Sequence, residues 1–178
     1  HEAFLQAVKT LLYGADPLEN RIDTFAGIAN SDERKPRRAV WDFMAEVLHF
    51  RDPPTYPLMT RWVWDRQAMS GALREFVYAG DGESEIAIDN TPAHFEALRV
   101  WLVERLSEQG FYRDLPFMID LLLAQAYTEY VLSMSSGMGM FGNDFGAKME
   151  PVEFVVKLLG VDPVRPGGRS RVKRIAVH

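Results

Sequence analysis

The sequence contains no cysteine, and this absence excludes several kinds of structural and catalytic site. A disulfide framework, a thiolate metal site and a cysteine nucleophile all require thiols. Long apolar runs are also missing. The longest, residues 118–124, is interrupted by Asp120 and is far shorter than the roughly 20 residues that span a bilayer. No basic segment followed by an apolar stretch opens the chain, so we expect a cytoplasmic protein without membrane contact.

Motifs for common catalytic chemistries are absent too. The sequence has no Walker-type phosphate loop, no dinucleotide-binding glycine fingerprint and no nucleophile-elbow serine. Glu46 and His49 have the spacing of a di-iron motif, but such a site needs a second pair and two further carboxylates, and the second pair is missing. We therefore predict no catalytic residue, no metal and no cofactor, and we favour a protein that is not an enzyme.

What is present has the composition of a globular domain. Of 178 residues, 47% are apolar and 25% are charged, and the chain is long enough to bury a core. Apolar residues recur at helical spacing between capping residues, prolines and glycines. We predict an all-α orthogonal bundle of about seven helices, at residues 2–13, 17–26, 37–50, 58–76, 91–110, 114–134 and 152–159.

Two segments interrupt the helical pattern. Residues 51–57 contain three prolines, which predicts an irregular connector. Gly80-Asp81-Gly82 marks a turn, and its flanks suit either one short β-hairpin near residues 76–88 or a plain loop. We expect a single helical domain at residues 1–164, with two halves joined near residues 79–90, followed by a basic tail at residues 165–178.

The net charge of −5 is unevenly distributed. The tail after residue 164 is basic and contains no acidic residue, whereas the body of the domain is acidic. A second basic cluster lies at residues 34–38, at a predicted helix N-terminus, where backbone amides attract anions. Local pairing with acidic residues of the same stretch is the alternative interpretation of this cluster. The stripe Arg38, Asp42, Glu46 and His49 predicts a solvated helix face with intrahelical ion pairs.

The residues from Leu11 to Trp64 resemble a known kind of module. Residues 17–25, Pro-Leu-Glu-Asn-Arg-Ile-Asp-Thr-Phe, precede a central apolar helix, and residues 52–57, Asp-Pro-Pro-Thr-Tyr-Pro, follow it. This order is similar to the helical module of McrB-type restriction NTPases and related prokaryotic defence proteins, and more distantly to helix-hairpin-helix DNA glycosylases. Thr60 stands where the glycosylases have an aspartate, and their glycine-rich hairpin is missing. The resemblance implies a helical accessory module that contacts DNA or a protein partner.

We predict a non-enzymatic helical interaction domain, associated with nucleic acid in a prokaryotic defence-type system. The predicted nucleic-acid contacts are Arg34, Lys35, Arg37, Arg38, Arg61, Arg169, Arg171, Lys173 and Arg174. One alternative is a small helical enzyme or ligand-binding protein whose cleft is lined by Trp62, Trp64, Tyr127 and Tyr130. Another is a structural subunit that docks on a partner through the Gly/Met-rich loop, at Met138, Met140, Phe141 and Phe145.

Overall fold

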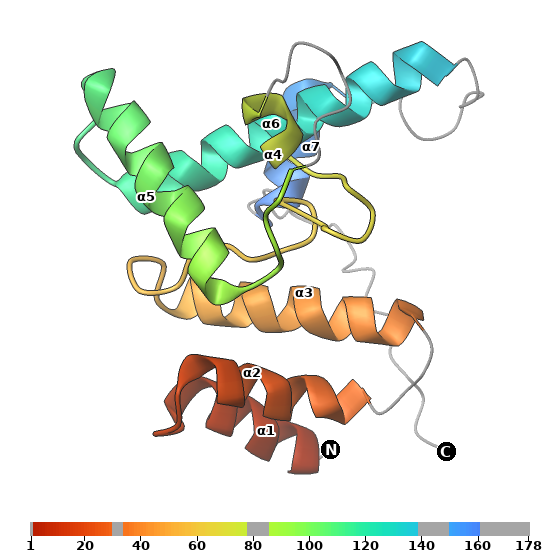
Figure 1. The fold of residues 1–178 in the computed structure, drawn as a ribbon, viewed down its shortest axis with the longest axis vertical. Helices are drawn as coiled ribbons and strands as arrows, with labels where there is room; N and C mark the ends of the chain where they lie inside the picture. The colour runs from red at the N-terminus through yellow and green to blue at the C-terminus, as the bar shows by residue number, and fades with distance from the viewer. Residues whose placement is uncertain (1, 30–33, 78–85, 139–149, 161–178) are drawn as a thin grey trace, which may run out of the picture.

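A computed structural model of the protein describes residues 2–29, 34–77, 86–138 and 150–160 (Figure 1). Seven α-helices and one 3-10 turn lie in these ranges, and no strand does, so the all-α prediction is confirmed. The elements are α1 (Glu2–Tyr13), α2 (Leu18–Ala26), η1 (Gly27–Ala29), α3 (Arg34–Arg51), α4 (Leu73–Phe76), α5 (Pro92–Glu108), α6 (Leu115–Met138) and α7 (Pro151–Leu158).

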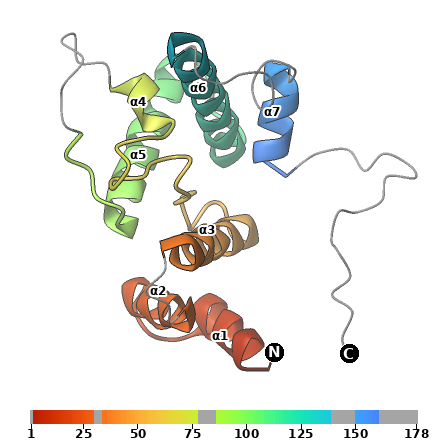
Figure 2. The same cartoon turned by 90° about the vertical axis from the view of Figure 1, so that its right-hand side faces the viewer.

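Helix α3 lies in the middle of the molecule. Helices α1 and α2 pack side by side on one side of it, and α5 and α6 lie on the opposite side, with α7 against α6 (Figures 1 and 2). The buried side chains form one hydrophobic cluster that includes residues from both halves of the chain. It includes Met44 and Leu48 of α3, Phe25 of α2 and Trp64 of the following segment, all of them almost completely buried.

The helix predicted at residues 58–76 is wrong. Only Leu73–Phe76 are helical, and residues 58–72, called here the 58–72 segment, form a compact irregular structure. Gly71 has a φ of 131°, which no helix contains, and a Cβ there would lie 2.6 Å from the carbonyl oxygen of Val63. Met69, with a φ of 49°, also departs from helical geometry. The apolar spacing of this segment reflects burial against α3, which overrides helix propensity.

The other predicted boundaries agree more closely with the structure. Thr91 caps α5, because its side chain accepts a hydrogen bond from the backbone N–H of His94. Gly160, with a φ of 65°, follows the end of α7. The turn of the predicted hairpin lies outside the described residues. Its described flanks are not strands, since Phe76 ends α4 and residues 86–88 are irregular. In the ranges that the structure covers, no helix has the length and hydropathy needed to cross a membrane.

Candidate functional site

The spacing of the polar stripe of α3 predicts a solvated helix face, and this prediction is wrong. Its side chains bind partners from other parts of the chain instead of each other. Arg38 donates to Asp65, Asp42 accepts from Arg61, and His49 is bonded to Asp120 of α6. Only Glu46 stays exposed. Partial burial of its carboxyl group, and next the Asp42 carboxylate, raises the pKa of Glu46 above its ordinary value.

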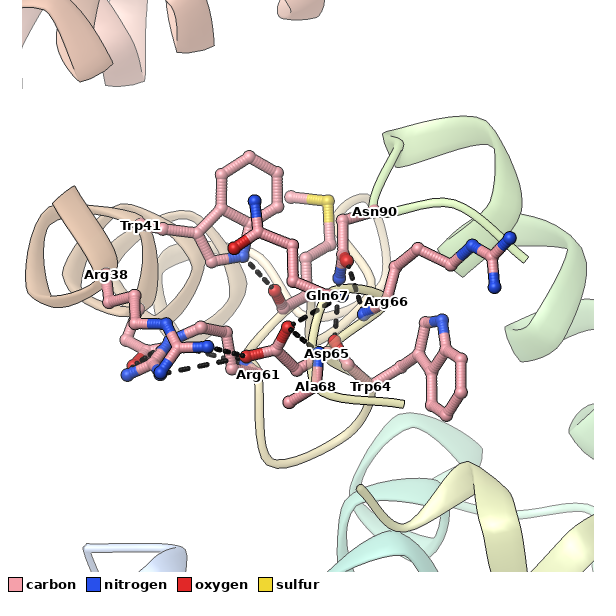
Figure 3. Close-up of polar contacts among 11 residues, drawn as sticks. Arg38, Trp41, Arg61, Trp64, Asp65, Arg66, Gln67, Ala68 and Asn90 are labelled. Atoms are coloured by element: carbon pink, nitrogen blue, oxygen red, sulfur yellow. Dashed lines mark hydrogen bonds and ion pairs between the residues drawn. The ribbon is translucent and has the colours of Figure 1, made fainter. Parts of the chain in front are cut away.

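Arginines of α3 and of the 58–72 segment surround a concavity of about 200 Å³ that lies between these two elements. We call it the arginine pocket. It is lined by Arg37, Arg38, Trp41, Arg61, Asp65, Gln67 and Asn90. Figure 3 shows the guanidinium groups of Arg38 and Arg61 on the same side of Asp65, and Trp41 lines the same concavity. Arg37 and Arg38, which are adjacent in α3, therefore meet Arg61 of the 58–72 segment at one site.

Asp65 holds the pocket together. Its Oδ1 accepts hydrogen bonds from the backbone N–H groups of Gln67 (3.0 Å) and Ala68 (3.1 Å), which forms a turn after the aspartate. Its Oδ2 accepts from Arg38 Nη2 at 3.1 Å and lies 3.9 Å from Arg61 Nη1. One buried carboxylate thus fixes both the local backbone and the positions of two guanidinium groups (Figure 3).

Arg61 is anchored a second time by Asp42 of α3. Its Nε and Nη2 both donate to Asp42 Oδ2, at 3.0 and 2.5 Å, and its backbone N–H donates to Asp42 Oδ1 at 3.0 Å. A charge-assisted pair with several hydrogen bonds fixes both position and orientation. The Nη1 group of Arg61 makes no hydrogen bond with the described residues, because its only carboxylate neighbour lies at 3.9 Å.

Trp41 and Asn90 complete the walls of the pocket. The indole N–H of Trp41 donates to the carbonyl oxygen of Met59 at 2.8 Å, which fixes the orientation of the ring. Asn90 lies just before α5. It accepts from the backbone N–H of Arg66 at 2.8 Å and donates to the carbonyl oxygen of Trp64 at 2.6 Å. These bonds attach the 58–72 segment to α3 on one side and to α5 on the other.

The charge of the pocket is close to balanced. Arg37, Arg38 and Arg61 face Asp42 and Asp65, which leaves one net positive charge. Arg37 supplies it, since this exposed side chain forms no ion pair with the part of the chain that the structure describes. Arg38 and Arg61 are thus paired with carboxylates, but the partners come from other segments and not from the same stretch of sequence.

The remaining predicted contacts can be placed only in part. Helix α3 includes the backbone of Arg34 and Lys35, and α6 ends at Met138, but these three side chains lie outside the described structure. The same holds for Arg169, Arg171, Lys173 and Arg174 of the tail, and for Met140, Phe141 and Phe145 of the Gly/Met-rich loop.

The predicted aromatic cleft has a different arrangement. Trp64 is fully buried and donates its indole N–H to the carbonyl oxygen of Ile88 at 2.7 Å. Trp62 packs on Tyr127, which stacks on Tyr130, with ring centroids 5.9 and 6.1 Å apart. None of these four rings lines the arginine pocket. The Trp62–Tyr127 contact joins the two halves, whereas Tyr127 and Tyr130 both belong to α6.

Three features of the site were not predicted from the sequence. They are the position of Trp41 in the pocket wall, the turn that Asp65 forms, and the contact that Asn90 makes with the 58–72 segment. The signal in the sequence is Asp65 itself, because an aspartate side chain often accepts a hydrogen bond from the backbone N–H two residues further along the chain, which forms a turn. In the described ranges, no group of three or more histidine or acidic side chains is arranged to hold a metal ion.

Comparison with other proteins adds nothing to this geometry, because no protein family, curated protein or solved structure matches the chain. The similarity of residues 11–64 to McrB-type modules stays a prediction from sequence. The arginine pocket is therefore the feature from which a function can be inferred.

Proposed function

We propose that the protein is a non-enzymatic interaction domain that contacts nucleic acid through the arginine pocket. One observation carries this proposal: Arg37, Arg38 and Arg61 come from two segments and converge on a single concavity that also contains an aromatic ring. Guanidinium groups bind phosphate oxygens through paired N–H donors, and aromatic rings accept bases. The prokaryotic defence setting suggested by the sequence belongs to the same proposal.

The guanidinium groups keep donors for a phosphate even though they are paired. Arg has five N–H donors, and the hydrogen bonds of Arg38 with described residues use one nitrogen, Nη2. Arg61 keeps its Nη1 group, and Arg37 keeps all of its donors among the described residues. A phosphate in the pocket can therefore be bound without breaking the bonds to Asp65 and Asp42.

The near balance of charge predicts modest affinity. A polyanion that meets three arginines also meets two aspartates, so long-range attraction is weak and contact has to be local. We expect dissociation constants in the range of about 10⁻⁴ to 10⁻⁶ M, which is typical of sequence-independent binding at physiological salt.

The test is a salt titration of binding to a fluorescent oligonucleotide. If the pocket neutralises one phosphate, log K should fall against log salt with a slope of about −0.7 for a single strand and about −0.9 for a duplex. Arg37→Glu should lower both the affinity and the slope. Arg113→Glu is the matched control, because Arg113 is also exposed, lies between α5 and α6 and does not line the pocket. Absence of binding at low salt would refute the proposal.

A further inference from the structure

We infer that the arginine pocket takes one unstacked nucleotide of a single strand, with the base against Trp41 and the phosphodiester on Arg38 and Arg61. This inference rests on the proposed function and specifies its ligand. It follows from three properties of the pocket: a fixed aromatic wall, a charge that matches one phosphodiester, and a small volume.

The aromatic wall is already oriented before a ligand arrives. Trp41 is held by its hydrogen bond to the carbonyl oxygen of Met59, and its ring packs partly on the core while still lining the pocket. A base that stacks on this ring orders no additional protein side chain there. Every base has a π-face, so such stacking favours nucleic acid without selecting a sequence.

The charges of the pocket match one phosphodiester. Three arginines and two aspartates leave one positive charge, and a phosphodiester carries one negative charge. The Nη1 group of Arg61 and the Nε and Nη1 groups of Arg38 supply donors that the described structure leaves without hydrogen bonds. A second phosphate in the same concavity would face Asp65 and Asp42 without a compensating charge, so we expect one phosphate per pocket.

The volume of the pocket favours a single nucleotide. About 200 Å³ is below the roughly 300–1,000 Å³ of pockets that enclose drug-sized ligands. A planar base with its phosphate at the rim suits this space. In a duplex the bases are stacked and paired, and moving one into a pocket costs a few kcal/mol. A single strand lacks most of this penalty, so it should bind more tightly than a duplex of the same sequence.

The first experiment changes the ligand and leaves the protein intact. Wild-type protein is titrated with a short oligothymidylate, with the same strand made entirely of abasic nucleotides, with a duplex, and with thymidine monophosphate. Tryptophan emission and the anisotropy of labelled strands are recorded at low salt. We expect the single strand to bind most tightly, to quench tryptophan emission, and to lose affinity when its bases are removed.

The second experiment isolates the aromatic ring of Trp41. Trp41→Phe and Trp41→Leu both remove the indole N–H, so they lose the bond to Met59 equally, but only phenylalanine keeps an aromatic face. The leucine variant should bind the single strand about 5- to 150-fold more weakly than wild type, which corresponds to the stacking of one base. The phenylalanine variant should recover part of this loss. Trp101→Leu is the control, because Trp101 is 39% exposed on α5 and does not line the pocket.

The outcomes separate this inference from the proposed function. Equal or tighter binding of the duplex, or equal binding of the abasic strand, overturns the inference while nucleic-acid binding stands. If thymidine monophosphate binds as tightly as the strand, the ligand is a free nucleotide, and the inference is also overturned. If no nucleic acid binds at low salt, the proposed function and the inference both fail. Circular dichroism spectra test whether each variant is folded, and the ligand series needs no variant.

Discussion

Replacing His49 with alanine should destabilise the protein by about 3–5 kcal/mol, because it leaves a buried carboxylate without its partner. The side chains of His49 and Asp120 are 2% and 7% exposed, and His49 Nε2 lies 2.9 Å from Asp120 Oδ2. The other ring nitrogen, Nδ1, lies 2.8 Å from the carbonyl oxygen of Tyr56. No other hydrogen bond to the Asp120 carboxylate occurs in the described structure.

The proton count of this pair follows from its geometry. A carbonyl oxygen can only accept, so Nδ1 of His49 carries a hydrogen and donates it to Tyr56. One further proton lies between Nε2 and the Asp120 carboxylate, on either side of the hydrogen bond. The pair as a whole is therefore neutral, which explains how it is tolerated beside apolar residues such as Leu102 and Leu123, around a cavity of about 20 Å³.

The alanine variant removes two hydrogen bonds and enlarges that cavity. Asp120 then lacks its hydrogen-bond partner in an apolar environment, and Tyr56 loses the donor to its carbonyl group. Asp120→Asn is the matched control. An amide N–H can donate to Nε2 of a neutral imidazole, so this change keeps the contact and should cost no more than about 1.5 kcal/mol.

The assay is urea unfolding at neutral pH, followed by far-ultraviolet circular dichroism and by tryptophan emission. We expect His49→Ala to lose clearly more unfolding free energy than Asp120→Asn. The slope of the unfolding free energy against urea concentration should be the same for both variants and the wild type. If both variants lose the same small free energy, the pair does not hold α3 on α6. A double change to leucine at both positions should be more stable than His49→Ala, since it removes the uncompensated carboxylate as well.

Three further predictions use other features of the described structure. Gly71→Ala should destabilise the fold by more than about 1 kcal/mol in thermal unfolding, because of its φ of 131° and the Val63 carbonyl 2.6 Å from the new Cβ, whereas Gly27→Ala meets no atom within 4 Å and should be tolerated. Burial, and next Asp42, raises the pKa of Glu46, so this group contributes stability that is complete below its unfolded pKa and is lost as pH rises through its folded pKa. Urea unfolding is measured from below the unfolded pKa of Glu46 to above its folded pKa. Over this range Glu46→Gln should abolish the decrease in unfolding free energy that accompanies rising pH. Asp65→Asn keeps the acceptor for the Gln67 and Ala68 N–H groups, but its amide NH2 group faces Arg38 Nη2, which can only donate. The guanidinium groups of Arg38 and Arg61 then lose their common anchor, so binding of a single strand at low salt should weaken while the fold stays intact. Tighter binding would contradict the role of Asp65 in positioning them.

The helices that could be predicted from sequence are those whose boundaries are local. Thr91 followed by Pro92 marks the start of α5 because the capping bond to His94 spans three residues. The 58–72 segment was mispredicted because its apolar residues are spaced as in a helix, while its backbone is determined by packing and by Gly71. Periodicity reports which residues are buried, and it does not report the backbone that buries them.

The polar contacts of the site were beyond local patterns for a related reason. Arg38 and Asp42 have the spacing of intrahelical partners, yet their ion-pair partners lie 27 and 19 residues further along the chain. His49 and Asp120 are 71 residues apart, and in the sequence Asp120 only interrupts an apolar run. A single sequence shows which side chains carry charge, whereas the fold decides which of them meet.

The irregular 58–72 segment is what makes the arginine pocket possible. In a helix the backbone N–H groups of Gln67 and Ala68 would bond to carbonyl groups four residues earlier, and Asp65 could not bind them. Because the chain turns there, the carboxylate is buried with its second oxygen directed to the guanidinium groups of Arg38 and Arg61. The same carboxylate lowers the attraction of the pocket for anions and orders the two side chains that would bind them. The proposed ligand, one nucleotide of a single strand, would be recognised by the positions of these donors and of Trp41, and for that reason we expect it to suit the pocket better than the continuous charge of a duplex.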